Sequence, residues 1–178
     1  MITGIHLEKD IEKAVEDLKY IEWTDIQIRS IPKIQEGKDV IAQSRTGSGK
    51  TATFGLPILE KIVHGNGLQV LILVPTRELC EQDNSEMRKF AKYKKMNIIP
   101  VYGGVSINPQ IDGLRHADIV VGTPGRILDH IQRRTIELSK VNVLVLDEAD
   151  KMFEMGFIDH VKRIISYLKT NRQTLLFS

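Results

Sequence analysis

The fold of this chain is decided by one stretch, residues 39–51, which reads Asp39-Val40-Ile41-Ala42-Gln43-Ser44-Arg45-Thr46-Gly47-Ser48-Gly49-Lys50-Thr51. Its first five residues resemble a strand, and an apolar helical pattern begins where it ends. A glycine-rich loop in that context lets backbone amides converge on phosphate oxygens at a helix N-terminus. The stretch therefore predicts a binding site for a nucleoside triphosphate over Ser44 to Thr51.

The residue types in this loop each suit phosphate chemistry. Gly47 and Gly49 permit positive φ and a close approach of backbone to ligand. Lys50 supplies a point charge, and the Thr51 hydroxyl can ligate a magnesium ion. Ser44 stands where the strict pattern has glycine, a place that a small residue can fill. A solvated glycine-serine turn is the plain alternative, which the strand-loop-helix context disfavours.

Length and composition suit one domain in a reducing compartment. The chain has 178 residues, a net charge of +2 and a single cysteine, Cys80, so an intrachain disulfide is excluded. We expect Cys80 to be a packing residue. No apolar run reaches the length that spans a bilayer, and no signal sequence is visible, so we expect a cytoplasmic protein without a membrane partner. The small positive charge permits a polyanionic partner without requiring one.

Short apolar runs alternate with helical patterns along the chain. Helices are predicted at 50–63, 76–95, 107–116, 125–134 and 151–169, after two helical patterns within 7–34 that are interrupted around Trp23-Thr24 and Pro32. Buried strands are predicted at Val40-Ile41, Leu68 to Val74, Ile98 to Tyr102, Ile119 to Val121, Val141 to Leu146 and Leu175 to Phe177. This order predicts an α/β fold with a doubly wound, mainly parallel sheet and helices on both faces. The loops that follow the strands then share one edge, where ligands of such sheets bind.

An acidic tetrad follows the predicted strand 141–146: Asp147-Glu148-Ala149-Asp150. At a strand end on the same edge as Lys50 and Thr51, Asp147 can hold the hydrated magnesium ion, and Glu148 can orient and deprotonate an attacking water. The alternative is that these acidic residues only stabilise the N-terminus of a helix through its dipole and have no catalytic role. The phosphate loop several strand-helix units upstream favours the catalytic interpretation.

Together these motifs resemble the first RecA-like domain of a DEAD-box RNA helicase, a P-loop NTPase family named for the tetrad. Further matches follow in the order of the family: Thr24-Asp25-Ile26-Gln27, Ser44 to Thr51, Pro75-Thr76-Arg77-Glu78-Leu79, Gly103-Gly104 and Thr123-Pro124-Gly125-Arg126. The ending Leu175-Leu176-Phe177-Ser178 resembles the entrance to the Ser-Ala-Thr element of the family.

The resemblance implies ATP and Mg²⁺ as cofactors. It assigns recognition of the adenine edge to Gln27 and a link between that segment and the phosphate loop to Thr24. An amide suits adenine better than guanine, so ATP should be preferred over GTP. Tyr20 corresponds to a family aromatic near the base, although Lys19 replaces the usual glycine and Trp23 the usual proline. Packing of Tyr20 and Trp23 within the domain remains the alternative.

The resemblance also implies RNA as a partner, bound without sequence preference through backbone contacts. The implied RNA-binding residues are Pro75, Thr76, Arg77, Gly103, Gly104, Thr123, Pro124, Gly125 and Arg126. For each loop taken alone, the alternative is an ordinary turn without a binding role, because glycine and proline are common in turns. A basic run from Arg88 to Lys95 has no family motif and is expected to be a solvated helix face.

For domain organisation, we expect residues 1–178 to form a single N-terminal RecA-like ATP-binding domain that ends inside the Ser-Ala-Thr element. Family members pair it with a second RecA-like domain, whose arginines complete the ATP site, and some use protein cofactors. Asp150 and Ser178 would couple the nucleotide site to RNA. We expect the chain alone to bind nucleotide and hydrolyse it poorly. Three functions fit: a helicase or RNP remodeller, an ATP-gated RNA clamp, and a DNA-translocating ATPase.

Overall fold

The computed structural model describes residues 4–45 and 47–178. These residues contain one six-stranded sheet, in which every pair of neighbouring strands is parallel and the order is β1-β6-β5-β2-β4-β3. The strands are β1 (Val40–Ala42), β2 (Val70–Leu73), β3 (Ile98–Val101), β4 (Ile119–Gly122), β5 (Val143–Leu146) and β6 (Gln173–Phe177). All six predicted strands and the doubly wound α/β class are confirmed.

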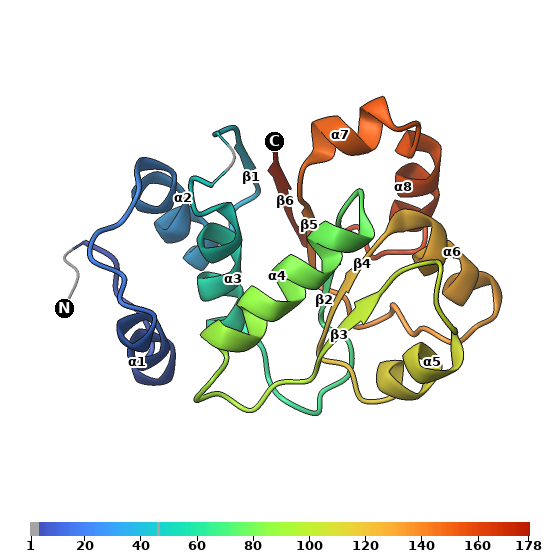
Figure 1. Ribbon diagram of the computed structural model, residues 1–178, viewed down its shortest axis with the longest axis horizontal. Coiled ribbons are helices and arrows are strands. Elements are labelled where there is room, and N and C mark those ends of the chain that lie inside the picture. Colours follow the sequence, from blue (N-terminus) through green and yellow to red (C-terminus); the bar gives the residue numbers. More distant parts are fainter. Residues whose placement is uncertain (1–3, 46) are drawn as a thin grey trace.

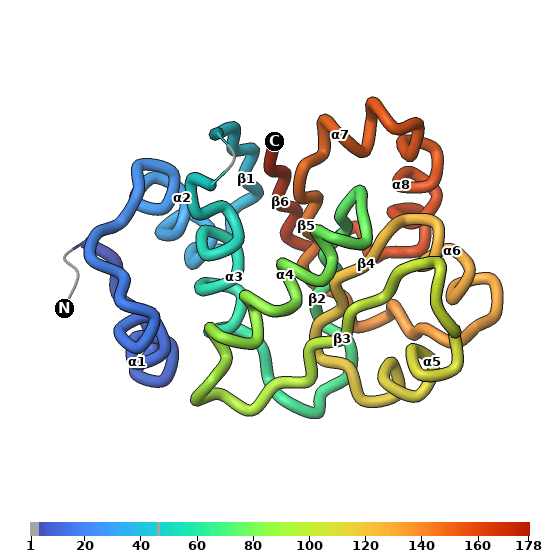
Figure 2. The backbone as a smooth tube through the Cα atoms, in the orientation of Figure 1, coloured from blue at the N-terminus to red at the C-terminus, as the bar shows by residue number. Residues whose placement is uncertain are grey.

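Helices cover both faces of this sheet (Figure 1). They are α1 (Lys9–Asp17), α2 (Asp25–Gln35), α3 (Lys50–Lys61), α4 (Arg77–Phe90), α5 (Asn108–Leu114), α6 (Pro124–Gln132), α7 (Ala149–Glu154) and α8 (Ile158–Ile165). β6 enters the sheet between β1 and β5, so the last strand of the chain lies beside the first (Figure 2).

The strands alternate their side chains between two separate cores. On β2, Val70 and Ile72 pack with α1 to α4, whereas Leu71 and Leu73 pack with α6 and α8. Successive side chains of a strand point to opposite faces, and a parallel sheet covered on both faces is therefore apolar throughout. This explains why the strand sequences are continuous apolar runs.

Three helix predictions differ from the structure. The helix predicted over 76–95 ends at Phe90, the last residue of α4. Pro32 lies inside α2 and does not end it, since the helix continues to Gln35. Only one ladder hydrogen bond is lost at a proline, and the buried Ile31 and Ile34 anchor the helix around it. The single helix predicted over 151–169 is divided into α7 and α8, because Gly156 between them adopts a left-handed φ of 81°.

The carboxyl ends of all six strands lie at one edge of the sheet, because the strands are parallel. The loops that begin at Gln43, Val74, Tyr102, Thr123 and Asp147 leave the sheet at this edge. Within the described residues, none of the helices has the length and apolar character needed to cross a membrane.

Candidate functional site

The phosphate loop connects β1 to α3 at the carboxyl edge of the sheet. Gly49 precedes the first helical residue with a φ of 84°, and Gly47 has a φ of 79°, so both glycines occupy the left-handed region that their positions were predicted to need. Lys50 Nζ donates to the backbone carbonyl of Ser44 at 3.2 Å. The lysine ammonium therefore lies over the loop in which phosphate is expected. Thr46 was also predicted to bind nucleotide and lies outside the described residues.

The segment at the start of α2 is bonded directly to this loop. Thr24 Oγ1 donates to the Ser48 carbonyl at 2.9 Å, which confirms the predicted link. Gln27 donates from Nε2 to the Gly49 carbonyl at 3.2 Å and accepts from the Thr24 amide at 2.9 Å. The Gln27 side chain is therefore buried between helix and loop, and both polar atoms of its amide have partners within the domain.

The two aromatic residues upstream of α2 pack within the domain. Tyr20 is half-buried, with ring centroids 6.0 Å from Trp23 and 6.5 Å from Phe90. Burial raises the pKa of the Tyr20 hydroxyl. This geometry supports the packing alternative for both residues. It gives no independent support to Tyr20 as a contact of the adenine base.

The acidic tetrad begins where β5 ends. Asp147 is buried and accepts a hydrogen bond from the Glu148 amide at 3.0 Å. Burial raises the pKa of the Asp147 carboxyl, and the neighbouring ammonium of Lys50 opposes that rise. The proximity of these two groups brings the tetrad and the phosphate loop into one site, as the motif order predicted.

Glu148 adopts a left-handed backbone conformation, with φ 51° and ψ 49°, at the N-cap of α7. Such a conformation strains a residue that carries a Cβ, and strain of this kind gathers at functional sites. Its carboxylate forms an ion pair with Lys151 at 2.7 Å. Glu148 thus retains some exposure at this turn, whereas the preceding Asp147 is buried.

A third carboxylate, which the sequence analysis did not assign, completes this cluster. Asp83 lies on α4, is fully buried and accepts a hydrogen bond from Thr51 Oγ1 at 3.1 Å. Burial, and to a lesser extent the nearby Asp147, raise the pKa of Asp83 to about 8. Its signal was present in the sequence, because Asp83 falls three residues after Cys80 and four before Met87, on the buried face of an amphipathic helix.

The oxygen donors in this cluster fit a hard cation. Magnesium at phosphate sites is held by one or two carboxylates together with phosphates and waters. Asp147 supplies one such carboxylate and Thr51 a hydroxyl, and Asp83 leaves Oδ2 without a hydrogen-bond partner among the described residues. In the described part of the chain, this site included, no group of three or more histidine, cysteine or acidic side chains is arranged to hold a metal without other ligands.

Comparison with known proteins agrees with this geometry. The model of the DEAD/DEAH box helicase family matches residues 24–178. The chain belongs to this family. DEAD-box ATP-dependent RNA helicase CshA of Geobacillus kaustophilus is 47% identical over 174 residues, which cover 97% of this chain and 37% of that protein. ATP-dependent RNA helicase CshA of Listeria monocytogenes is 51% identical, with 97% and 34% covered. The chain spans about a third of the length of these curated relatives.

Solved structures of DEAD-box proteins share the fold. A DEAD box protein from the hyperthermophile Methanococcus jannaschii superposes with a TM-score of 0.95 at 44% identity, over 98% of this chain and 48% of that one. A hypothetical ATP-dependent RNA helicase from Sulfolobus tokodaii gives a TM-score of 0.89 at 42% identity, over 97% and 50%.

The three loops expected to bind RNA in this DEAD-box chain are joined to one another. Arg77 stacks over the ring of Tyr102, with the guanidinium carbon 4.9 Å from the ring centroid. Arg126 donates to the Val105 carbonyl at 3.1 Å. The Thr123 amide bonds to the Val101 carbonyl at 2.9 Å. Loops after β2, β3 and β4 therefore form one continuous surface.

Exposure within this surface corrects part of the prediction. Arg77, Gly103, Gly104 and Gly125 are exposed, whereas Pro75 and Pro124 are buried. Pro124 begins α6, where a missing amide hydrogen costs nothing. Direct RNA contact by the two prolines is therefore not supported. Thr76 caps α4 by accepting from the Leu79 amide at 3.2 Å.

Ser178, expected to couple the sites, is bonded to the start of the phosphate loop. Its carbonyl accepts from the Ser44 amide at 3.0 Å, and its amide donates to the Ala42 carbonyl at 3.1 Å. Asp150 is exposed on α7. No hydrogen bond joins Asp150 to Ser178 in the described residues. Their coupling of the nucleotide site to RNA stays a prediction.

The basic run after Arg88 lies away from these loops. Lys92 forms an ion pair with Asp17, and Lys94 pairs with Glu8 at 3.0 Å. Positive charge in this run is thus partly neutralised by α1 and the segment before it. Most of the run is exposed outside the site, as predicted, but only Arg88 and Lys89 lie on a helix, because α4 ends at Phe90.

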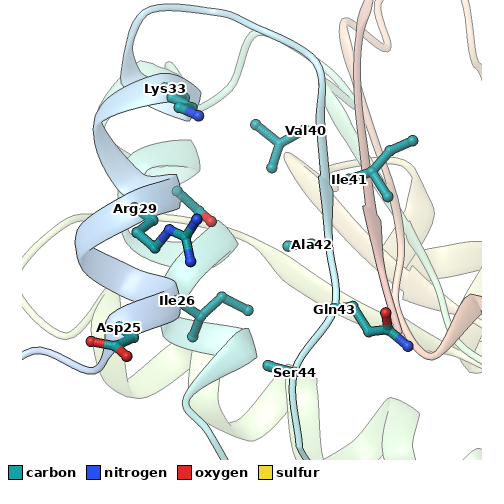
Figure 3. Close-up of a pocket in the computed structure, with 10 residues that line it drawn as sticks. Asp25, Ile26, Arg29, Lys33, Val40, Ile41, Ala42, Gln43 and Ser44 are labelled. Atoms are coloured by element: carbon teal, nitrogen blue, oxygen red, sulfur yellow. The ribbon is translucent and has the colours of Figure 1, made fainter.

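A cavity of about 370 Å³ lies beside the phosphate loop, between α2 and β1 (Figure 3). Arg29 and Lys33 of α2 line one wall, and Val40 to Ser44 line the other. Among the described residues that were predicted to bind nucleotide, only Ser44 lines it. Gln27 and Thr24 do not line it and are instead bonded to the carbonyls of Gly49 and Ser48.

Proposed function

We propose that this chain is the ATP-binding half of a DEAD-box RNA helicase, which couples ATP binding and hydrolysis to RNA binding and to local duplex unwinding or RNP remodelling. The observation that carries the proposal is the meeting of Lys50, Thr51 and Asp147 at one edge of the sheet. A phosphate-binding lysine, a hydroxyl and a buried carboxylate are the groups that a magnesium-bound triphosphate needs.

In this proposal the backbone amides of residues 44–51 hold the phosphates and Lys50 neutralises their charge. Thr51 and Asp147 would hold the magnesium ion, which supplies further charge neutralisation on the phosphates when bound. Glu148 orients the attacking water and accepts its proton. Gln27 selects adenine after its amide leaves the Gly49 carbonyl.

RNA would bind across the surface formed by Thr76, Arg77, Gly103, Gly104, Thr123, Gly125 and Arg126. Exposed amides and cations there suit phosphate and ribose contacts, which carry no sequence information and so favour binding without sequence preference. Asp150 and Ser178 would communicate between the two sites once RNA and ATP are bound. In a longer protein, a second RecA-like domain would complete the ATP site, and protein cofactors would act on the two domains together.

The nucleotide part of the proposal is tested on this chain with a fluorescent ADP and ATP competitor, with and without Mg²⁺. We expect weak binding that ATP displaces better than GTP. Lys50→Ala should weaken it at least tenfold, since a charge-assisted phosphate contact contributes about 1.5–3 kcal/mol. Lys89→Ala, which removes an exposed cation from α4, is the matched control. Equal binding by the two variants would contradict the phosphate role of Lys50.

The catalytic part requires a protein that also contains a second RecA-like domain. An arginine finger contributes roughly 10³–10⁵ to turnover in related chemistry, so these 178 residues alone should hydrolyse ATP very slowly. RNA should stimulate hydrolysis in the longer protein and have no measurable effect on this chain. Vigorous RNA-stimulated turnover by this chain alone would show that its own residues complete the site.

A further inference from the structure

Asp83 is the one member of the acidic cluster to which neither the motifs nor the proposed function gives a role. It comes from the second turn of α4, far in sequence from both Thr51 and Asp147. Its Oδ1 accepts the hydrogen of the Thr51 hydroxyl at 3.1 Å, and its Oδ2 has no hydrogen-bond partner among the described residues. Burying one carboxyl group beside a second, that of Asp147, is unfavourable, so the group calls for an explanation.

The three oxygen-bearing side chains lie at different depths. Thr51 is 9% exposed, Asp147 is 3% exposed and Asp83 is 0% exposed. Asp83 is therefore the most enclosed of the three. If a nucleotide and its cation approach from the side on which Thr51 and Asp147 retain exposure, those two residues stand between Asp83 and both ligands.

A hydroxyl has one hydrogen and two acceptor lone pairs. When a threonine oxygen ligates a cation, its lone pairs must face the metal and its hydrogen needs an acceptor on the other side. Asp83 occupies that side, since it receives the Thr51 hydrogen from within the protein. The site is thus arranged before the cation arrives, which reduces the reorganisation that binding requires.

We propose that Asp83 is a positioning residue that orients the Thr51 hydroxyl as a magnesium ligand by accepting its hydrogen from behind the site. The inference rests on the proposed nucleotide-binding function and adds a residue outside the phosphate loop and the acidic tetrad. Asp83 acts through Thr51 and does not itself contact magnesium or phosphate.

The test measures how much Mg²⁺ is needed for a fluorescent ADP to bind this chain. Asp83→Val and Asp83→Ala remove the acceptor and should raise the midpoint Mg²⁺ concentration roughly five- to tenfold, the effect of losing one hydrogen bond. Asp83→Asn keeps an acceptor oxygen and should shift the midpoint less than about twofold. Affinity for ADP in EDTA should be the same in all four proteins.

One further measurement keeps orientation distinct from a merely structural role. In a Thr51→Val background, Asp83→Val should produce no additional shift of the Mg²⁺ midpoint, since the hydroxyl to be oriented is gone. Additive shifts in the double variant would overturn the proposal.

The outcomes separate this inference from the proposed function. If the unaltered chain binds no nucleotide in the presence of Mg²⁺, the proposed function fails. If it shows Mg²⁺-dependent binding that Asp83→Val and Asp83→Ala leave unchanged, only the role of Asp83 fails. A shift as large in Asp83→Asn as in Asp83→Val would also overturn orientation by hydrogen-bond acceptance.

Discussion

Gln27 donates a hydrogen bond from its side-chain amide to the backbone carbonyl of Gly49 at 3.2 Å. The residue expected to recognise adenine is thereby attached to the last residue of the phosphate loop before α3. A Cβ added to Gly49 would lie 2.4 Å from Gln27 Nε2, closer than two such atoms can approach. The adenine segment and the phosphate loop therefore depend on each other's conformation.

This contact predicts that Gly49→Ala weakens nucleotide binding more than Gly47→Ala does. Both glycines have positive φ, so each substitution costs about 1–2 kcal/mol in backbone strain. At Gly47 a Cβ meets nothing within 4 Å, whereas at Gly49 it displaces Gln27. We expect at least a further fivefold loss of ADP affinity in Gly49→Ala, measured by fluorescence titration alongside melting temperatures. Equal losses would show that Gln27 moves aside without consequence.

Glu148 supplies a second prediction, through its left-handed backbone. At a φ of 51° any residue with a Cβ is strained, whereas glycine, which has no Cβ, is not. Both Glu148→Gly and Glu148→Ala lose the ion pair with Lys151, so their difference isolates the backbone. We expect Glu148→Gly to be the more stable by about 1 kcal/mol in urea unfolding. If Glu148→Ala is equally stable, the left-handed conformation is not strained here.

The side chain of Glu148 is tested separately in a longer protein that hydrolyses ATP. Glu148→Gln keeps the size of the side chain and removes its capacity to accept a proton. ATP affinity should change by less than about threefold while hydrolysis slows by roughly 10²-fold or more, the usual contribution of a general base. Turnover that stays unchanged would exclude Glu148 from that role.

The fold was predictable because its signals are local. Six continuous apolar runs and the glycine-rich loop after β1 are enough to define a parallel sheet with ligands at its carboxyl edge. The errors arose where a single residue gives the backbone a conformation that the helical sequence pattern does not predict. Gly156 divides an apparent helix into α7 and α8, and buried neighbours hold Pro32 within α2.

The site was predictable only where a motif lies on a loop at that edge. Asp83 belongs to no such loop, and its role depends on α4 packing beside α3, a contact between segments that are distant in sequence. The burial of Pro75 and Pro124 likewise follows from packing. Sequence spacing identifies residues that share an element, but the approach of different elements is determined by the whole core.

Arg77 and Arg126 lie in the same proposed RNA surface and should respond differently to removal. Arg77 is exposed and stacks on Tyr102, whereas the Arg126 side chain is 13% exposed and bonds to Val105 and Gln110. In a longer protein, Arg77→Ala should weaken binding of all RNA sequences alike and reduce the salt slope by about 1. Arg126→Ala should in addition lower the melting temperature of this chain. A large loss of stability in Arg77→Ala would contradict the expectation that Arg126, and not Arg77, also stabilises the fold.

His130 predicts a pH dependence of stability. It is fully buried, bonding to Gln110 at 3.1 Å and Thr135 at 2.8 Å, both neutral partners. Burial, together with the charges of Arg126 and Arg133, lowers the pKa of His130 to about 4, while Asp129 opposes them. The unfolded chain, with a histidine pKa near 6.5, therefore takes up this proton first as the pH falls.

Stability from His130 should be fully present above pH 6.5 and decline as the pH falls towards 4. Between pH 7 and pH 5 the free energy of unfolding should fall by about 2 kcal/mol more in the unaltered chain than in His130→Gln, which has no titrating ring. Urea unfolding at the two pH values measures this, and the comparison cancels the titration of carboxylates common to both proteins. Parallel pH profiles would mean that His130 takes up its proton equally well in the folded chain.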